Sequence, residues 1–119
     1  MSWLRIGSVL LTLAIALGAF GAHALRASLS VDAKAIYQTA VLYHLVTGVG
    51  LLAVGLVAAQ RPGDRLITAS GWALTIGVVL FSGSLYLLSV TGVKKFGMIT
   101  PLGGLGLLGG WLLFAAAIR

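Results

Sequence analysis

Charged residues occur in only a few short clusters of this 119-residue chain, and their spacing limits what it can fold into. Between the clusters lie four uncharged stretches, residues 6–25, 35–60, 66–93 and 96–118, of 20, 26, 28 and 23 residues. A helix rises about 1.5 Å per residue, so each stretch is long enough to cross a hydrocarbon core of about 30 Å. The spacing therefore predicts an all-α fold, an integral membrane four-helix bundle.

The composition excludes an ordinary soluble domain. Charged residues make up 8% of the chain and apolar residues 60%, whereas a soluble domain has about 25% charged residues. The net charge of +6 would suit a nucleic-acid-binding protein, but the cations are spread over all the predicted loops, so we expect no nucleic-acid partner. Because cysteine is absent, disulfides, thiolate metal sites and cysteine nucleophiles are excluded.

We predict one domain over residues 1–119, with helices at about 5–25, 31–60, 66–91 and 100–118. Ser30 suits the cap of the second helix, and the turn Gln60-Arg-Pro-Gly-Asp-Arg65 makes the second and third helices antiparallel neighbours. Thr100 and Pro101 predict an N-cap followed by proline in the first helical position. The first segment also resembles a signal peptide, but we expect it to remain as a permanent helix.

Lysine and arginine are divided equally between the two ends of the predicted bundle, four on each side. The rule that cytoplasmic loops carry the excess of these residues therefore does not fix the orientation. We expect a multi-pass protein of the bacterial inner membrane with its termini in the cytoplasm. The expected partners are the lipid bilayer and either copies of the same chain or a larger membrane-protein complex.

Small residues form a stripe on one face of the first and of the fourth helix. Gly18 and Gly21 belong to the first stripe, and Gly106 and Gly110 form a GxxxG pair in the second. Small residues let helix backbones approach closely in lipid, so both stripes are predicted packing surfaces. Two readings stay open: packing within one bundle, or contact between subunits.

Polar side chains on the second and third helices predict a polar bundle interior. The third helix carries a stripe of Gly71, Thr75, Ser82, Tyr86 and Ser89. The second carries Tyr37, His44, Gly48 and Gly55, with Thr47 at the margin. If the stripes face each other, hydroxyl groups surround the imidazole of His44, although such hydroxyls also commonly bond to carbonyls of their own helix.

The two histidines differ in their predicted depth. His44 lies ten residues beyond Lys34, roughly 15 Å along the helix and near the middle of the membrane. It is either a packing histidine with satisfied hydrogen bonds or a ligand or proton site. His23 lies near the charged end of the first helix, from which it can reach the interface. Their depths differ by roughly 12 Å, which argues against a haem or metal ion held by both.

Residues for familiar chemistry are missing from the sequence. The only acidic residues are Asp32, in the first turn of the second predicted helix, and Asp64, in a predicted loop, and no nucleophile motif or zinc-type spacing occurs. We therefore expect no enzyme, no metal and no cofactor. The leading hypothesis is a structural or accessory subunit that acts through helix packing and oligomerisation. The alternatives are an oligomeric transporter or channel lined by His44 and the hydroxyl stripe, and lipid or haem binding at His44.

Four segments resemble the signature blocks of a known family. They are Gly18-Ala-Phe-Gly-Ala-His-Ala-Leu25, Tyr43-His44, Leu80-Phe-Ser-Gly-Ser-Leu-Tyr86 and Ile99-Thr-Pro-Leu-Gly-Gly104. In these segments the chain resembles the domain of unknown function 423 family. That family includes YgdD-like bacterial inner-membrane proteins and is similar to the eukaryotic transmembrane protein 256. The resemblance implies a four-helix membrane protein but no reaction, substrate or cofactor. It draws attention to His23, Tyr43, His44, Ser82, Ser84, Tyr86, Thr100 and Pro101.

Overall fold

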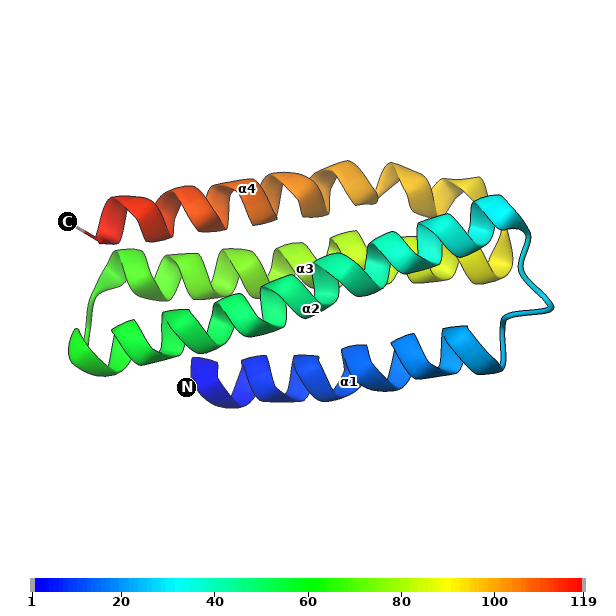
Figure 1. Ribbon diagram of the computed structural model, residues 1–119. Helices are drawn as coiled ribbons and strands as arrows, with labels where there is room; N and C mark the ends of the chain where they lie inside the picture. Colours follow the sequence, from blue (N-terminus) through cyan, green and yellow to red (C-terminus); the bar gives the residue numbers. More distant parts are fainter. Residues whose placement is uncertain (1, 119) are drawn as a thin grey trace.

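The protein is described here from a computed structural model that covers residues 2–118. Its elements are α1 (Trp3–His23), α2 (Val31–Gln60), α3 (Arg65–Thr91), the short 3-10 helix η1 (Lys94–Met98) and α4 (Thr100–Ala117) (Figure 1). Four candidate membrane spans, one of them joining η1 to α4, are long and apolar enough to cross a bilayer, and no strand occurs within residues 2–118. The predicted all-α membrane bundle is therefore confirmed.

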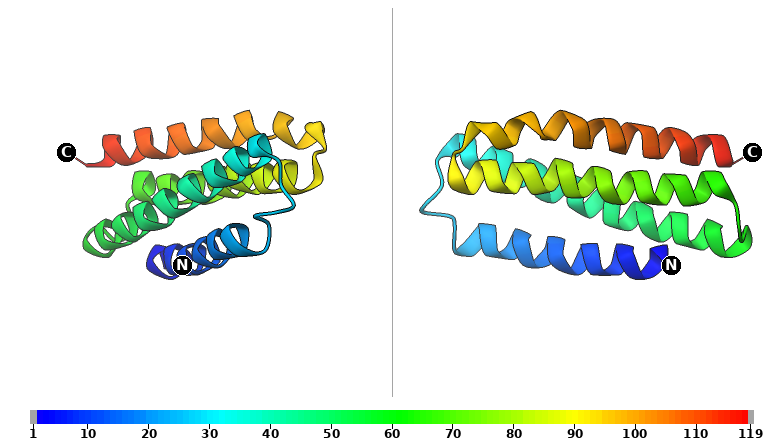
Figure 2. Two further views of the ribbon diagram at one scale, coloured as in Figure 1. Left: turned by 45° about the vertical axis from the view of Figure 1, so that its right-hand side comes forward. Right: turned by 180° about the vertical axis from the view of Figure 1, so that it is seen from behind.

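The four helices run up and down, so that both ends of the chain lie at the same end of the bundle as the α2–α3 turn (Figures 1 and 2). The main contacts join α1 with α2, α2 with α3, and α3 with α4. The helix α2 has 30 residues, about 45 Å at 1.5 Å per residue, which matches the 47 Å length of the bundle. It crosses the bundle obliquely (Figure 1) and makes most of the contacts with α1, while Trp3 of α1 packs on Trp72 of α3.

Local interactions fix the start of α2 and both ends of α3. Ser30 accepts a hydrogen bond from the backbone N–H of Ala33 at 3.1 Å, as the sequence predicts for the start of α2. Asp64 accepts bonds from the N–H groups of Leu66 and Ile67 at the start of α3. At the other end of α3, Gly92 takes a left-handed conformation with φ of 72°.

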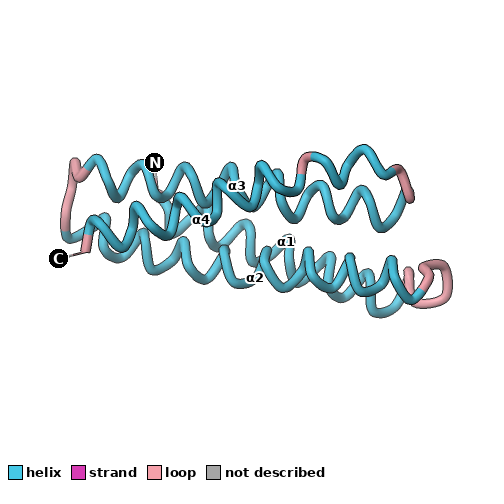
Figure 3. The backbone as a smooth tube through the Cα atoms, turned by 90° about the horizontal axis from the view of Figure 1, so that it is seen from above, coloured by secondary structure: helices cyan, strands magenta, loops and turns pink. Residues whose placement is uncertain are grey.

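The predicted capping role of Thr100 is wrong. The cap position of α4 is Ile99, whose backbone is helical, and no side chain caps the helix. Figure 3 shows why: η1 leads into α4 with only a short break between them, so no extended residue precedes the helix. The hydroxyl of Thr100 instead lies 2.6 Å from that of Ser84 in α3, while Pro101 occupies the first turn as predicted.

The small-residue stripes are used inside the molecule. A Cβ added to Gly77 in α3 would lie 2.7 Å from the backbone nitrogen of Leu107 and 2.9 Å from the carbonyl carbon of Gly106. One added to Gly110 would lie 2.7 Å from Leu74, and one at Gly18 would lie 3.3 Å from Val41 of α2. Gly21 lies directly against the ring of Tyr37. These faces pack α1 on α2 and α4 on α3. Of the two alternatives for the stripes, the contacts therefore agree with packing within one bundle.

Candidate functional site

The imidazole of His44 lies halfway along α2 and is 6% exposed. Its Nδ1 atom lies 2.9 Å from the hydroxyl oxygen of Tyr86 in α3. The two rings meet edge to face, with their centroids 5.9 Å apart. The histidine is therefore held in one orientation by a partner from the neighbouring helix.

Two further hydroxyl groups surround this pair. Ser82 donates a hydrogen bond to the carbonyl of Ala40 in α2 at 2.8 Å. Tyr37 donates to the carbonyl of Leu17 in α1 at 2.5 Å, and its ring packs edge to face on Tyr86 with centroids 5.2 Å apart. The polar cluster of Tyr37, His44, Ser82 and Tyr86 thus joins α1, α2 and α3 over roughly two turns of α2.

One atom of this cluster has no partner. The Nε2 atom of His44 is buried and makes no hydrogen bond of standard geometry with any described residue. The backbone of Leu10 in α1 faces the ring but does not complete such a bond. Since a buried polar atom without a partner costs about 1–3 kcal/mol, Nε2 is a point at which an additional group would be stabilising.

The same imidazole lines an apolar groove between α1 and α3. The groove has a volume of about 360 Å³ and contains no charged residue. Its walls are apolar side chains of α1 and α3, with His44, Ser82 and Tyr86 as its polar members; the apolar residues are Leu10, Leu13, Ala16, Leu17, Val78 and Val79. A lipid-facing groove with one polar point suits a largely apolar ligand that carries a single hydrogen-bonding group.

The hydrogen bond between His44 and Tyr86 also favours one protonation state of the ring. Nδ1 is the hydrogen-bond partner of the Tyr86 hydroxyl, and no second acceptor for that hydroxyl is found among the described residues. If Nδ1 were the donor, the phenolic proton would be left without an acceptor. The arrangement therefore favours a hydroxyl that donates to Nδ1, and a neutral ring that carries its proton on Nε2.

The remaining predicted residues lie outside this groove. Tyr43 is 43% exposed and its ring packs on Phe81, while His23 is exposed at the end of α1. Of the predicted hydroxyl stripe on α3, only Ser82 and Tyr86 bond to groups of α2. Thr75 and Ser89 donate to carbonyls of their own helix.

Sequence reasoning did not find the wall of the groove that α1 provides. Leu10, Leu13 and Leu17 line it and recur at helical spacing, but leucines at such spacing on a membrane helix are ordinary lipid-facing residues. Only the position of α1 on α2 distinguishes them. Residues 2–118 contain no group of three or more His, Asp or Glu side chains that could hold a metal ion.

Comparison with known proteins gives a consistent result. Residues 17–104 match the family model described as a protein of unknown function, DUF423. The chain is 40% identical over 112 residues to the UPF0382 membrane protein YwdK of Bacillus subtilis, covering 94% of this chain and 91% of YwdK. It is 38% identical over 106 residues to the UPF0382 inner membrane protein YgdD of Escherichia coli K12, covering 88% of this chain and 80% of YgdD.

No solved structure matches the chain. The relatives are named as membrane proteins and, for YgdD, as an inner membrane protein, in agreement with the four membrane-spanning helices. The chain is therefore a multi-pass membrane protein of unknown function that belongs to the DUF423 family.

Proposed function

We propose that this protein binds a lipid-soluble molecule in the groove between α1 and α3, through a hydrogen bond to His44. The observation that carries the proposal is the unpaired, buried Nε2 atom of an imidazole that lines an apolar groove. The role is one of binding, in keeping with a sequence whose two carboxylates both fall in loops or at helix starts.

The hydrogen bonding of the ring narrows the class of ligand. With Tyr86 donating to Nδ1, Nε2 carries a proton and offers it as a donor. The matching ligand group is an acceptor oxygen, such as the carbonyl of a quinone or of an ester. Haem suits the groove less well, because none of the lining residues is a cation that could neutralise its propionates.

Access to Nε2 depends on α1. This helix has the smallest buried share of the four membrane spans, 11% of its most apolar window, and its main contacts are with α2. A small movement of α1 away from α3 would widen the groove in front of the ring. The Leu10 backbone, which faces the ring, would move with it.

The other proposals have less support. An accessory or oligomeric role stays a proposal, but the stripes of Gly18, Gly21, Gly106 and Gly110 no longer argue for it because intramolecular contacts occupy them. A transporter or channel would need a polar path, whereas the hydroxyl of Ser82 is engaged by Ala40 and the groove wall is apolar.

The proposal is tested with a probe of the expected chemistry. A benzoquinone with a decyl tail offers acceptor oxygens, and decylbenzene has the same tail without them. Purified protein in mild detergent should bind the quinone more tightly than decylbenzene, by about tenfold for one hydrogen bond to a buried donor. Native mass spectrometry of the protein mixed with each compound measures the two affinities.

Two histidine variants give the matched control. His44→Leu should reduce quinone binding to the level of decylbenzene, because the donor is gone while the apolar groove remains. His23→Leu removes an exposed imidazole outside the groove and should bind like the wild type. Equal binding of quinone by wild type and His44→Leu would refute the proposal.

A further inference from the structure

A second pocket lies at the end of the bundle where α1 leads into α2. Its volume is about 390 Å³, and it shares no lining residue with the groove at His44. Its polar members are Arg26, Lys34, Tyr37 and Gln38, and its apolar wall includes Gly18, Leu29 and Val41. We call it the basic pocket.

The basic pocket has two positive charges and no counter-charge. Neither Arg26 nor Lys34 forms an ion pair with any residue from 2 to 118, and the nearby acid Asp32 is exposed and does not line the pocket. Lys34 is half-buried, so part of its side chain lies against the pocket wall. The side-chain amide of Gln38 adds a hydrogen-bond donor to the same wall.

The pocket continues from charged to apolar along the α1–α2 pair. Arg26 lies in the loop after α1, and Lys34 lies in the first turns of α2, at the membrane surface. Gly18 and Val41 lie deeper, since Val41 is seven residues and roughly 10 Å beyond Lys34 along α2. Gly18 and Val41 form the inner end of the pocket, where α1 and α2 come into close contact: a Cβ at Gly18 would lie 3.3 Å from Val41.

We propose that the basic pocket binds an anionic phospholipid, with its phosphate between Arg26 and Lys34 and an acyl chain along Gly18 and Val41. Guanidinium and ammonium groups are the usual partners of phosphate, and basic pockets between membrane helices suit anionic headgroups. A lipid explains both parts of the pocket, whereas a free phosphate ion would use only the charged part. This site is independent of the ligand proposed at His44.

The test compares two lipids that differ in headgroup charge. Purified protein in a neutral detergent is given equal amounts of dioleoyl phosphatidylglycerol, which is anionic, and dioleoyl phosphatidylcholine, which is zwitterionic. Both lipids carry the phosphate, but the choline of phosphatidylcholine adds a cation that the two positive side chains repel. Native mass spectrometry should therefore show about a tenfold preference for phosphatidylglycerol. The double variant Arg26→Gln, Lys34→Gln should lose this preference.

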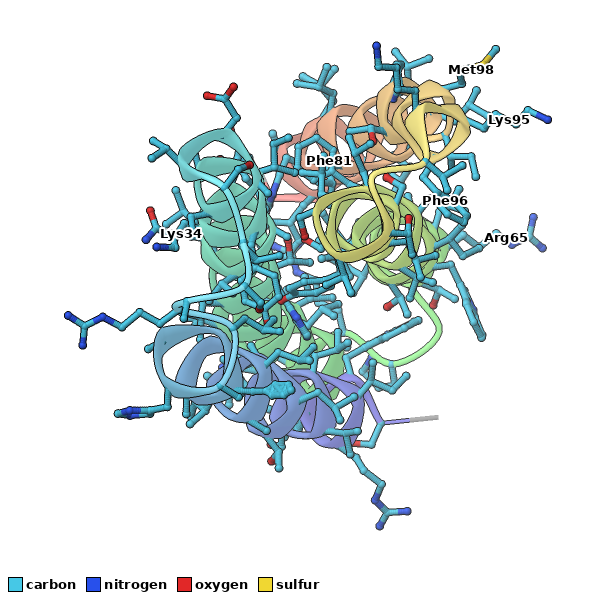
Figure 4. All side chains as sticks on the ribbon, turned by 90° about the vertical axis from the view of Figure 1, so that its right-hand side faces the viewer. Lys34, Arg65, Phe81, Lys95, Phe96 and Met98 are labelled. Atoms are coloured by element: carbon cyan, nitrogen blue, oxygen red, sulfur yellow. The ribbon has the colours of Figure 1, made fainter. Side chains whose placement is uncertain are left out.

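A matched control lies at the same end of the bundle. Figure 4 looks onto this end and shows Lys34 and Lys95 pointing outward on opposite sides. Lys94→Gln, Lys95→Gln changes the net charge by the same amount outside the pocket and should keep the wild-type preference. If both double variants lose it equally, binding depends on total charge alone and the proposal is wrong.

Two further measurements separate the remaining explanations. Ala22→Phe fills the pocket without changing its charge and should also abolish the preference, which keeps the test valid if the double variant does not fold. A large excess of inorganic phosphate should leave phosphatidylglycerol bound, because the acyl chain adds to its affinity. Displacement of the lipid by phosphate would overturn the lipid assignment in favour of a soluble anion.

Discussion

Nδ1 of His44 and the hydroxyl oxygen of Tyr86 lie 2.9 Å apart across the α2–α3 interface, while Nε2 of the same ring faces the Leu10 backbone without a hydrogen bond of standard geometry to any described residue. One nitrogen is thus fixed by the fold, and we propose that the other binds a ligand. Histidines that bind metal ions are arranged in a similar way: one ring nitrogen binds the ion, and the other forms a hydrogen bond that orients the ring.

Removal of the Tyr86 hydroxyl should destabilise the protein and loosen its choice of ligand. In Tyr86→Phe, Nδ1 loses its hydrogen-bond partner, so that neither ring nitrogen has a hydrogen bond of standard geometry. The free energy of unfolding should fall by about 1–3 kcal/mol. The ring is then free to place its proton on either nitrogen, so a ligand whose polar group only donates, such as a pyrrole with a decyl tail, should bind better than it does to the wild type. Unfolding in detergent and native mass spectrometry measure the two effects.

Tyr43→Phe is the control for this variant. Tyr43 also lies in α2, next to His44, but it is exposed and does not line the groove. Its loss of a hydroxyl should change neither stability nor ligand choice. A Tyr86→Phe protein that behaves like Tyr43→Phe would show that the bond to His44 does not orient the ring.

The close approach of α3 and α4 depends on Gly77. The Cβ of Gly77→Ala would lie 2.7 Å from the backbone of α4. A flexible side chain could move aside, but the backbone of a helix cannot, so the two helices would have to separate. The variant should lose about 1–3 kcal/mol of stability. Gly109→Ala is the control, because nothing lies within 4 Å of its added Cβ, and it should gain about 0.5–1 kcal/mol from helix propensity. Thermal unfolding in detergent that ranks the two variants the other way round would contradict the packing described.

Ser84 and Thr100 should be coupled in a double-mutant cycle. Their hydroxyl oxygens lie 2.6 Å apart, and hydrogen bonds between membrane helices contribute about 0.6 kcal/mol on average. Ser84→Ala and Thr100→Val should therefore show a coupling free energy of that size. Strictly additive effects would mean that Thr100 acts locally on α4, as a helix cap does.

Cysteine labelling can fix the orientation, because the chain has no cysteine of its own. Gln60 and Ser28 are exposed residues at opposite ends of the bundle. We predict that Gln60→Cys, which shares its end with both termini, faces the cytoplasm and resists a membrane-impermeant thiol reagent in whole cells. Ser28→Cys should react. The reverse pattern would place the termini outside.

The fold could be predicted from the sequence because the bilayer constrains it strongly. Uncharged stretches of sufficient length must be helices, and turn chemistry such as that around Pro62 and Gly63 fixes which helices are neighbours. The start of α4 could not be predicted, because Thr100 and Pro101 form a convincing cap motif in isolation. Only the helical backbone at Ile99 and the approach of Ser84 show that the hydroxyl is used elsewhere.

The candidate site could be predicted only in part. Helical spacing placed His44, Ser82 and Tyr86 on facing stripes, and the structure brings them together. The groove itself depends on how far α1 lies from α3, which the spacing of apolar residues does not encode. The basic pocket was likewise hidden, because Arg26 and Lys34 are eight positions apart and meet only where the loop brings the ends of α1 and α2 together.

The most direct test of the account is the protonation state of the His44 ring in the folded protein. Nitrogen-15 NMR of histidine-labelled protein, with His44→Leu to assign the signals, distinguishes a proton on Nε2 from one on Nδ1. We predict a neutral ring with its proton on Nε2, and a shift of the Nε2 signal when the decyl quinone is added. A proton on Nδ1, or an Nε2 signal that the quinone leaves unchanged, would contradict it.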